Sequence, residues 1–424
     1  MSAMIETSDR QIHYLTAQWI LPVSSAPIEW GFVAIQGERI QAVGHYNELP
    51  ESWAVPPPQA GSLITPGLIN THVHLEQSFP KPIPKAETEP FVDWLLNVIQ
   101  TTRPQNEPEA KFNRCLQGAE EALKTGTTFL NDIASGAESL TALQKTGLKG
   151  FVSLEVFHPG FEPIQIEHWL KQYQALQDSA QGHPRVQVGL SPHSLYNVSP
   201  QAWQALQAAL HPPLIHTHMA EFEAETHYLA GNPSDIDKLH QQVLNKTFKP
   251  KQPTSSPIQT LLNHHLLETP TVLAHAIHTT AHDRALMASF PVGIAHCPRS
   301  NLALHNQTLH WPHWQDSPIP MGLGTDGRLS TPNLDLRDEA RCAIGQHHWT
   351  PEQALYSLTM GGAKVLQMAQ ALGSLEAGKQ ADLVVWQATA SAQGSLPAAM
   401  IFDADTRVIH VMVDGESLLT GEEP

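Results

Sequence analysis

Short apolar runs rich in β-branched residues recur eight times along the middle of this chain. Helical stretches separate these runs, which cover 63–69, 127–130, 151–156, 186–190, 214–216, 271–274, 292–295 and 321–324. Strands that alternate with helices are typical of parallel βα units. Eight such units predict an α/β fold, a closed (β/α)8 barrel of the TIM type.

Helix start signals support the same pattern. Ser199 precedes Pro200, which is the arrangement of an N-cap followed by proline at the first helical position. Thr350 and Gln353 have the spacing of a capping box. The stretch 245–257, rich in Lys, Pro, Ser and Thr, predicts a loop insertion after the fifth strand.

Both ends of the chain carry a different pattern, in which short apolar runs alternate with turns. The runs are 12–15, 32–35 and 40–43 near the start, and 381–386 and 407–415 near the end. Two small β segments can complete one another's sheet. We therefore expect a composite β-sandwich made from 1–65 and 371–424, with the barrel, 66–370, inserted between them.

Charge and cysteine content exclude several classes of protein. Acidic residues outnumber basic ones by 41 to 24, and the net charge of -17 is spread along the chain, which argues against nucleic acid or anionic membranes as partners. The three cysteines have no paired spacing, which argues against disulfides and thiolate zinc sites. The first ten residues lack an apolar signal region and no membrane-length apolar window follows, so we expect a cytoplasmic protein.

His72 and His74 follow the first apolar run of the barrel. On an extended strand, residues two apart point to the same side, as two ligands of one metal must. His216 and His218 follow the fifth run, and we choose His218 as the third ligand because Glu221 stands three residues after it. At that spacing Glu221 can reach a metal-bound water and carry a proton to a leaving group.

Asp326, in Gly-Thr-Asp-Gly, is the fourth ligand candidate and a possible acceptor of a proton from the water. Imidazole and carboxylate ligands together favour Zn²⁺, or Fe²⁺, over calcium. His275 follows the sixth run, where it could orient or deprotonate the water, and His193 follows the fourth, where it could bind substrate. No lysine ends the fourth run, so we expect one divalent metal and no bridging carbamate.

These pieces resemble the amidohydrolase superfamily, in its deaminase and chlorohydrolase branch. The similarity rests on Pro-Gly-Leu-Ile-Asn-Thr-His-Val-His, His-Met-Ala-Glu, His-Cys-Pro-Arg-Ser-Asn and Gly-Thr-Asp, and on the closing Leu-Gly-Ser-Leu-Glu-Ala-Gly-Lys-Gln-Ala-Asp-Leu-Val-Val. It implies one metal held by His72, His74, His218 and Asp326. It also implies Glu221, His275 and Asp326 as the groups that carry protons during hydrolysis.

Glu76, Phe91 to Trp94 and Arg299 look most like aminodeoxyfutalosine deaminases, which act on an adenine nucleoside in menaquinone biosynthesis. The chain departs from that pattern at Ser194 and in the loop 245–257. The alternatives are deamination of S-adenosylhomocysteine or 5′-methylthioadenosine, guanine deamination and triazine hydrolysis. A non-catalytic barrel subunit is the alternative from another class.

Each predicted substrate contact has two interpretations. Arg299 could bind the benzoate of aminodeoxyfutalosine, or pair with a neighbouring acid and hold its loop. Trp94 and Phe91 could roof an aromatic substrate or pack their helix on the barrel. Glu76 could bind a ribose hydroxyl or a ring nitrogen. The expected partner is a small adenine nucleoside, and a homodimer is left open.

Overall fold

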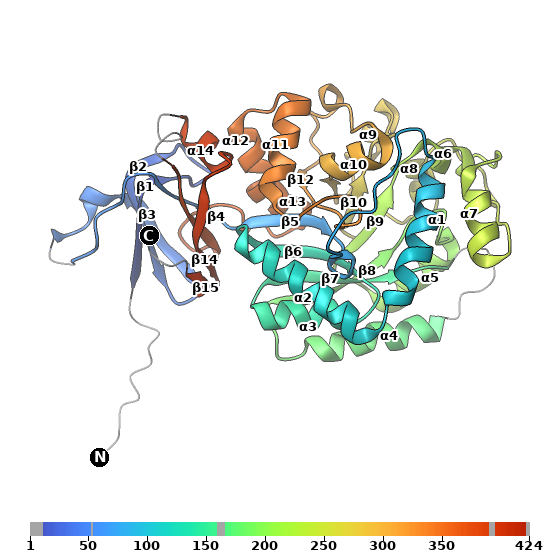
Figure 1. Cartoon of the computed structure of the whole chain (residues 1–424), viewed down its shortest axis with the longest axis horizontal. Helices are drawn as coiled ribbons and strands as arrows, with labels where there is room; N and C mark the ends of the chain where they lie inside the picture. Colours follow the sequence, from blue (N-terminus) through green and yellow to red (C-terminus); the bar gives the residue numbers. More distant parts are fainter. Residues whose placement is uncertain (1–11, 52–53, 159–165, 390–394, 421–424) are drawn as a thin grey trace, which may run out of the picture.

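The computed structural model describes residues 12–51, 54–158, 166–389 and 395–420. A barrel of parallel strands fills one side of the molecule and a sheet made from both ends of the chain fills the other (Figure 1). The sheet belonging to the barrel has the order β12-β11-β10-β9-β8-β7-β6-β5. Its strands are β5 (Leu68–Val73), β6 (Thr127–Ala134), β7 (Lys149–Val156), β8 (Val186–Pro192), β9 (Ile215–Met219), β10 (Thr271–His275), β11 (Val292–His296) and β12 (Met321–Leu323).

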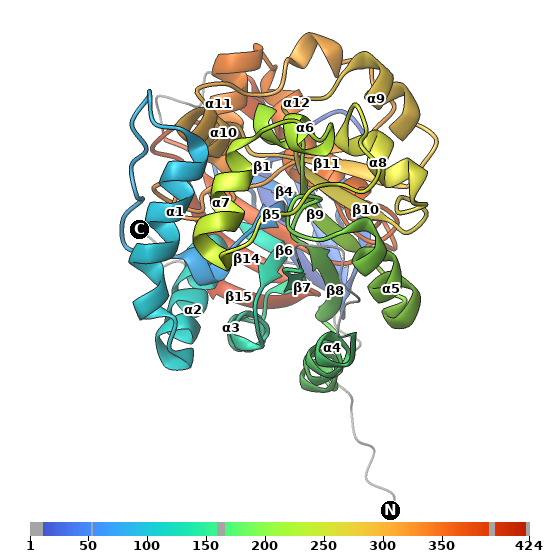
Figure 2. The same ribbon diagram turned by 90° about the vertical axis from the view of Figure 1, so that its right-hand side faces the viewer.

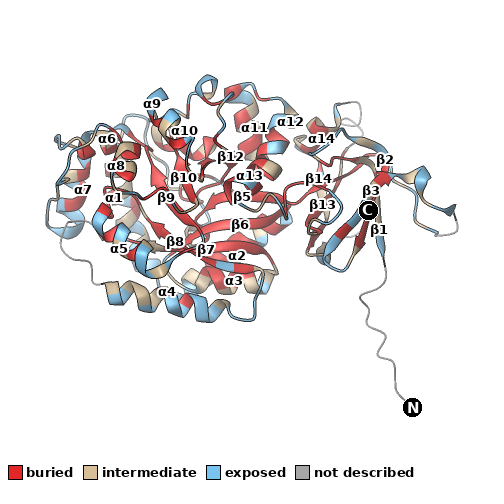
Figure 3. Cartoon of the chain, turned by 180° about the vertical axis from the view of Figure 1, so that it is seen from behind, coloured by how far each residue is buried: buried red, intermediate tan, exposed pale blue. Residues whose placement is uncertain are grey.

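Helices surround these strands, and the strands are buried along nearly their whole length (Figure 3). The α-helices are α1 (Phe91–Thr102), α2 (Pro108–Lys124), α3 (Glu138–Thr146), α4 (Ile166–Ala180), α5 (Pro200–Leu210), α6 (Glu223–Leu229), α7 (Asp235–Leu244), α8 (Pro257–Asn263), α9 (Ala281–Met287), α10 (Pro298–His305), α11 (Leu336–His347), α12 (Pro351–Tyr356), α13 (Gly362–Val365) and α14 (Pro397–Ile401). The predicted caps are confirmed: Ser199 accepts a hydrogen bond from the Ala202 N–H, and Thr350 and Gln353 form a capping box.

The barrel closes between its first and last strands. Val73 and Asp326 form a parallel bridge, and the Asp326 N–H donates to the His72 carbonyl over 3.0 Å. Gly324 makes this approach possible, because a Cβ there would lie 2.8 Å from the His72 backbone nitrogen. Closure therefore brings the last predicted ligand beside the first.

The composite sheet predicted from both termini is confirmed, and it has seven strands in the order β15-β14-β13-β4-β1-β2-β3. They are β1 (His13–Ile20), β2 (Ile28–Gln36), β3 (Arg39–His45), β4 (Ser62–Pro66), β13 (Leu383–Gln387), β14 (Arg407–Val413) and β15 (Glu416–Thr420). Strand β4 runs parallel to β1 and antiparallel to β13, so the two ends of the chain share one ladder.

The single strand predicted over 63–69 is wrong. It is two strands, β4 in the terminal sheet and β5 in the barrel, and Gly67 stands between them. A Cβ at Gly67 would lie 2.0 Å from the Thr128 hydroxyl oxygen, so only glycine allows the chain to pass from one sheet to the other here. The apolar run is continuous because both strands are buried.

Candidate active site

The four predicted metal ligands come together at the carboxyl ends of the barrel strands. His72 lies in β5 and His74 follows it, His218 lies in β9, and Asp326 follows β12. Asp326 Oδ1 lies 3.4 Å from His72 Nε2 and 3.6 Å from His74 Nε2. His74 Nε2 lies 3.2 Å from His218 Nε2.

These separations fit a metal ion. Zinc–nitrogen bonds of about 2.0–2.1 Å in a tetrahedron place neighbouring ligand atoms roughly 3.3 Å apart. His72 Nε2 is buried and has no hydrogen-bond partner among the described residues. Burial lowers the pKa of His72 to about 4, which keeps its imidazole neutral and able to coordinate. The donor set and its spacing therefore suit one divalent ion.

Hydrogen bonds to the far nitrogens orient two of these imidazoles. His72 Nδ1 lies 2.8 Å from His216 Nε2, and His218 Nδ1 lies 3.0 Å from the carbonyl of His193. Such contacts fix which ring nitrogen faces a metal. His216, the alternative third ligand, contacts the Nδ1 atom of His72 and not the Nε2 atom that faces Asp326.

Asp326 is held with one oxygen toward the histidines. Its Oδ2 accepts a hydrogen bond of 2.5 Å from the Ser300 hydroxyl, which leaves Oδ1 facing His72 and His74. The backbone of Asp326 has a φ of +55°, in the left-handed region that is uncommon for residues other than glycine. This turn directs the side chain into the barrel mouth immediately after β12.

Glu221 and His275 stand beside the ligand set. His275 Nε2 lies 3.9 Å from Glu221 Oε1, and His275 Nδ1 lies 2.8 Å from Asn301 Oδ1. His305 Nε2 lies 3.0 Å from the same Glu221 oxygen. Burial raises the pKa of Glu221, but the charge of His275 and the hydrogen bond from His305 outweigh it and hold the pKa at about 2.

Sequence reasoning missed His305. It ends α10, four residues after Asn301, so the two side chains lie on one face of the helix. Asn301 contacts His275 and His305 contacts Glu221. The sequence contains a signal for His305, because the motif His-Cys-Pro-Arg-Ser-Asn continues as Leu-Ala-Leu-His and so places a histidine four residues after Asn301.

A cavity of about 480 Å³ opens above these residues. Glu76, Trp94, His193, Glu221, His275 and Asp326 are among the residues that line it. Helices α1 and α7 lie side by side across this end of the barrel, away from the terminal sheet (Figure 2). The volume is in the range of about 300–1,000 Å³ that suits a small-molecule ligand.

The model of the amidohydrolase family matches residues 63–418. The chain belongs to the amidohydrolase family. A relative from Moorella thermoacetica (strain ATCC 39073 / JCM 9320), named 5-methylthioadenosine/S-adenosylhomocysteine deaminase, is 27% identical over 384 residues, which cover 86% of this chain and 83% of the relative. Membership and deaminase relatives make this protein a hydrolytic enzyme that acts on carbon–nitrogen bonds.

Solved structures share the fold of this amidohydrolase. An adenosine deaminase from Xanthomonas campestris with bound zinc superposes with a TM-score of 0.80 at 22% identity, covering 97% of this chain and 93% of that one. Helicobacter pylori aminofutalosine deaminase superposes with a TM-score of 0.81 at 20% identity, covering 96% of this chain and 100% of that one.

No helix among the described residues is long and apolar enough to cross a membrane.

Three of the four predicted substrate contacts of this amidohydrolase line the cavity. Glu76 accepts hydrogen bonds from the N–H and hydroxyl of Ser135, over 2.6 and 2.7 Å. Trp94 donates its indole N–H to the Ile83 carbonyl over 2.8 Å and stacks on Phe91 at 5.8 Å between ring centroids. The aromatic pair therefore both packs its helix and faces the cavity.

His193 is held by an acid that sequence reasoning did not single out. His193 Nδ1 lies 2.8 Å from Glu155 Oε1, and both side chains line the cavity. Phe157 stacks on the other side of the imidazole, at 4.6 Å between ring centroids. Glu155 is the next-to-last residue of the third strand of the barrel, β7, and its position near the carboxyl end of a strand was the available signal.

Arg299 does not line the cavity. It donates to Asn333 Oδ1 over 2.8 Å, and Asp338 and Glu339 each lie 3.6 Å from its guanidinium. This is the second interpretation offered for Arg299, in which it pairs with neighbouring acids and holds its loop. We therefore do not carry Arg299 into the substrate site.

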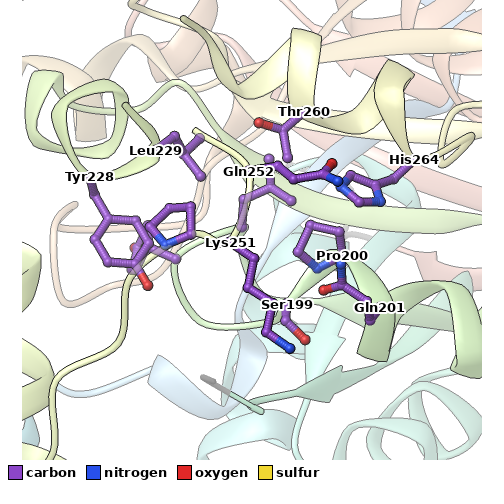
Figure 4. A pocket seen from close by; sticks show the side chains of 12 residues that line it. Ser199, Pro200, Gln201, Tyr228, Leu229, Lys251, Gln252, Thr260 and His264 are labelled. Atoms are coloured by element: carbon purple, nitrogen blue, oxygen red, sulfur yellow. The ribbon is translucent and has the colours of Figure 1, made fainter. Parts of the chain in front are cut away.

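A second pocket lies between α5, α6, α8 and the loop before α8 (Figure 4). Ser199, Tyr228, Lys251 and His264 are among its lining residues, and its volume is about 20 Å³. That is room for about one water molecule. This pocket is too small for a substrate. The cavity of about 480 Å³ is the candidate active site because predicted ligands and both proton carriers, Glu221 and His275, line it.

Proposed function

We propose that this amidohydrolase removes ammonia hydrolytically from the adenine ring of a nucleoside. The observation that carries the proposal is the pairing of Glu221 and His275 at 3.9 Å beside four ligand candidates, beneath a cavity of about 480 Å³. The relative named 5-methylthioadenosine/S-adenosylhomocysteine deaminase and the neighbour named aminofutalosine deaminase support this substrate class. The sequence favours aminodeoxyfutalosine, whose carboxylate was assigned to Arg299, but Arg299 does not line the cavity, so we propose only the substrate class.

His72, His74, His218 and Asp326 would hold the metal, with Zn²⁺ favoured and Fe²⁺ as the alternative. A divalent ion held there would lower the pKa of a water molecule and so supply a nucleophile near neutral pH. Location in the cytoplasm and a homodimeric state stay predictions from the sequence.

The protein's own residues move the protons. Glu221, whose carboxyl is ionised because its pKa is low, takes one proton from the attacking water and delivers it through Oε1 to the ring nitrogen next to C6, while Asp326 Oδ1 or His275 Nε2 accepts the other proton. Oxygen adds to C6, and the bond between C6 and the amino nitrogen then breaks. The proton that Asp326 or His275 accepted passes to the amino group, which leaves as ammonia, so the net change is that water is consumed and ammonia and a ring carbonyl are formed.

Tertiary contacts fix the positions of the proton carriers His275 and Glu221. Asn301 holds Nδ1 of His275, which leaves Nε2 toward Glu221. His305 contacts Glu221 Oε1 and limits its rotation. A proton carrier with a fixed position needs little reorganisation during the reaction.

The test is ammonia release from adenosine, 5′-methylthioadenosine, S-adenosylhomocysteine and aminodeoxyfutalosine by zinc-loaded protein. Glu221→Gln should retain one metal per chain and lose about 10²–10⁴-fold in kcat, because the proton carrier is gone. The control is metal content by mass spectrometry. Normal turnover by Glu221→Gln would show that Glu221 is not the proton carrier, and no turnover of any of these nucleosides would overturn the proposed function.

A further inference from the structure

The charges around the cavity differ from what an anionic substrate requires. Four carboxylates line it, from Glu76, Glu155, Glu221 and Asp326. Among the described residues, no lysine or arginine side chain lines it. The sequence of residues 159–165, which lie outside the described residues, contains no lysine or arginine. A negatively charged substituent would therefore meet carboxylates and no matching cation.

Basic residues close to the cavity are engaged elsewhere. Lys111 lies 3.7 Å from Glu76 and 3.2 Å from Glu138. Lys238 of α7 pairs with Asp93 of α1, on the outer side of the two helices that cross the cavity. Lys251 lines the small second pocket instead (Figure 4). Each of these charges already has a partner or another location.

The part of the cavity wall that α1 and α7 form is mostly apolar, with Thr102 and His240 as its polar members. Helix α1 contributes Trp94, Leu95, Val98 and Ile99, and α7 contributes Leu239, Val243 and Leu244. At the rim, Val243 is 47% exposed, Leu244 is 40% exposed and Phe157 is 48% exposed. Large apolar side chains left open to solvent around a cavity are typical of a surface that contacts an apolar ligand.

We infer that this enzyme selects adenine nucleosides whose 5′ substituent is uncharged and apolar, and discriminates against the same nucleosides with a carboxylate on that substituent. The inference rests on the proposed function. With the adenine ring at Glu221 and His275, the substituent extends either toward the apolar helices or toward Glu76 and Glu155. Neither direction offers an anion a lysine or arginine side chain among the described residues, and desolvating a carboxylate without such a partner is unfavourable.

A matched pair of substrates tests this inference on the zinc-loaded full chain. The pair is 5′-(2-carboxyethylthio)adenosine and its methyl ester, with 5′-methylthioadenosine as reference. We expect the ester and the reference to be deaminated, and the acid to have a kcat/KM lower by about tenfold or more. Equal or better turnover of the acid would overturn the inference and leave the proposed function intact. If none of the three is deaminated or bound, the proposed function fails and the inference with it.

A charge placed on the rim sharpens the test. Val243→Lys, at an exposed position, should raise the kcat/KM of the acid relative to the ester, because it supplies the missing cation. Val243→Met is the matched control of similar length without charge, and it should leave the ratio of acid to ester as in the unaltered enzyme. If Val243→Lys and Val243→Met have the same ratio, the missing cation does not determine the selection.

Discussion

Lys149 begins β7 at the amino end of the barrel, whereas Glu155 lies near the end of the same strand, beside the predicted metal ligands. The Nζ atom of Lys149 has three partners: it pairs with Asp382 at 2.8 Å and with Asp414, and it donates a hydrogen bond to Gln380 over 2.9 Å. At the other end His72 Nε2 is buried without a hydrogen-bond partner among the described residues.

The difference shows how one barrel uses buried polar groups for two purposes. At the amino end, opposite charges join the terminal sheet to the barrel, and the ammonium of Lys149 has three oxygen partners, although Asp382 Oδ2 is buried without one. At the carboxyl end, the ligand atoms and the proton carriers point toward a common space. Buried polar atoms without a hydrogen-bond partner raise the free energy of the folded state unless a ligand binds them. Such atoms are typical of functional sites.

The largest effect should come from removing a ligand. His72→Ala should reduce kcat by at least about 10³-fold and lower the metal content below one ion per chain, because a coordinating nitrogen is lost. Ammonia release and metal analysis measure the two effects. His265→Ala, at an exposed imidazole that pairs with Glu268, is the control and should change neither. Turnover by a chelated, metal-free preparation would contradict this prediction.

A substitution of Lys149 tests the charged contacts at the amino end of the barrel. Lys149→Met leaves Asp382 without its cation at a buried site and leaves Asp414 with Arg185 alone, and we expect a loss of about 3–5 kcal/mol in the free energy of unfolding. Urea unfolding measures it. Lys124→Met is the control, because Lys124 is exposed and its pair with Glu120 contributes little. If both variants lost the same amount, the junction would not depend on this charge.

His305 offers a smaller and more selective change. His305→Ala should lower kcat about tenfold at unchanged metal content, because Glu221 loses the group that orients it. His305→Gln retains a donor and should recover part of the rate. Pre-steady-state measurement of ammonia release separates this effect from product release. A loss of rate that His305→Gln does not rescue would indicate a purely structural role.

Arg299→Ala should change stability more than catalysis. Burial raises the pKa of Glu339 to about 8 although the charge of Arg299 lowers it. A carboxyl whose pKa is raised on folding binds its proton more tightly in the folded state. The free energy of unfolding therefore falls as the pH rises from 4.5, the ordinary pKa of a glutamate, toward 8, the pKa of Glu339 in the folded protein. Without Arg299 this decline should become steeper, by about 1 kcal/mol at pH 8. Thermal unfolding between pH 5 and 8 measures it, and a raised KM at unchanged stability would instead return Arg299 to the substrate site.

The sequence predicted the parts of this enzyme that follow one another along the chain. His72, His74, His218 and Asp326 each stand at the end of an apolar run, so periodicity alone places them at one edge of a parallel barrel. Several strands are longer than predicted, since polar residues such as Asn131, Asp132 and Ser191 continue strands whose apolar runs have ended. The polar interior of the barrel mouth hides the true ends of its strands from a pattern of hydrophobicity.

What only the tertiary structure decided are contacts between residues far apart in the chain. His216 lies behind His72, His305 reaches Glu221 across 84 positions, and Arg299 turns toward Glu339 and away from the cavity. Local sequence establishes that a strand ends in a histidine, because backbone periodicity is local. Which nitrogen faces the site, and which charges line the cavity, depends on how separate βα units pack around one axis.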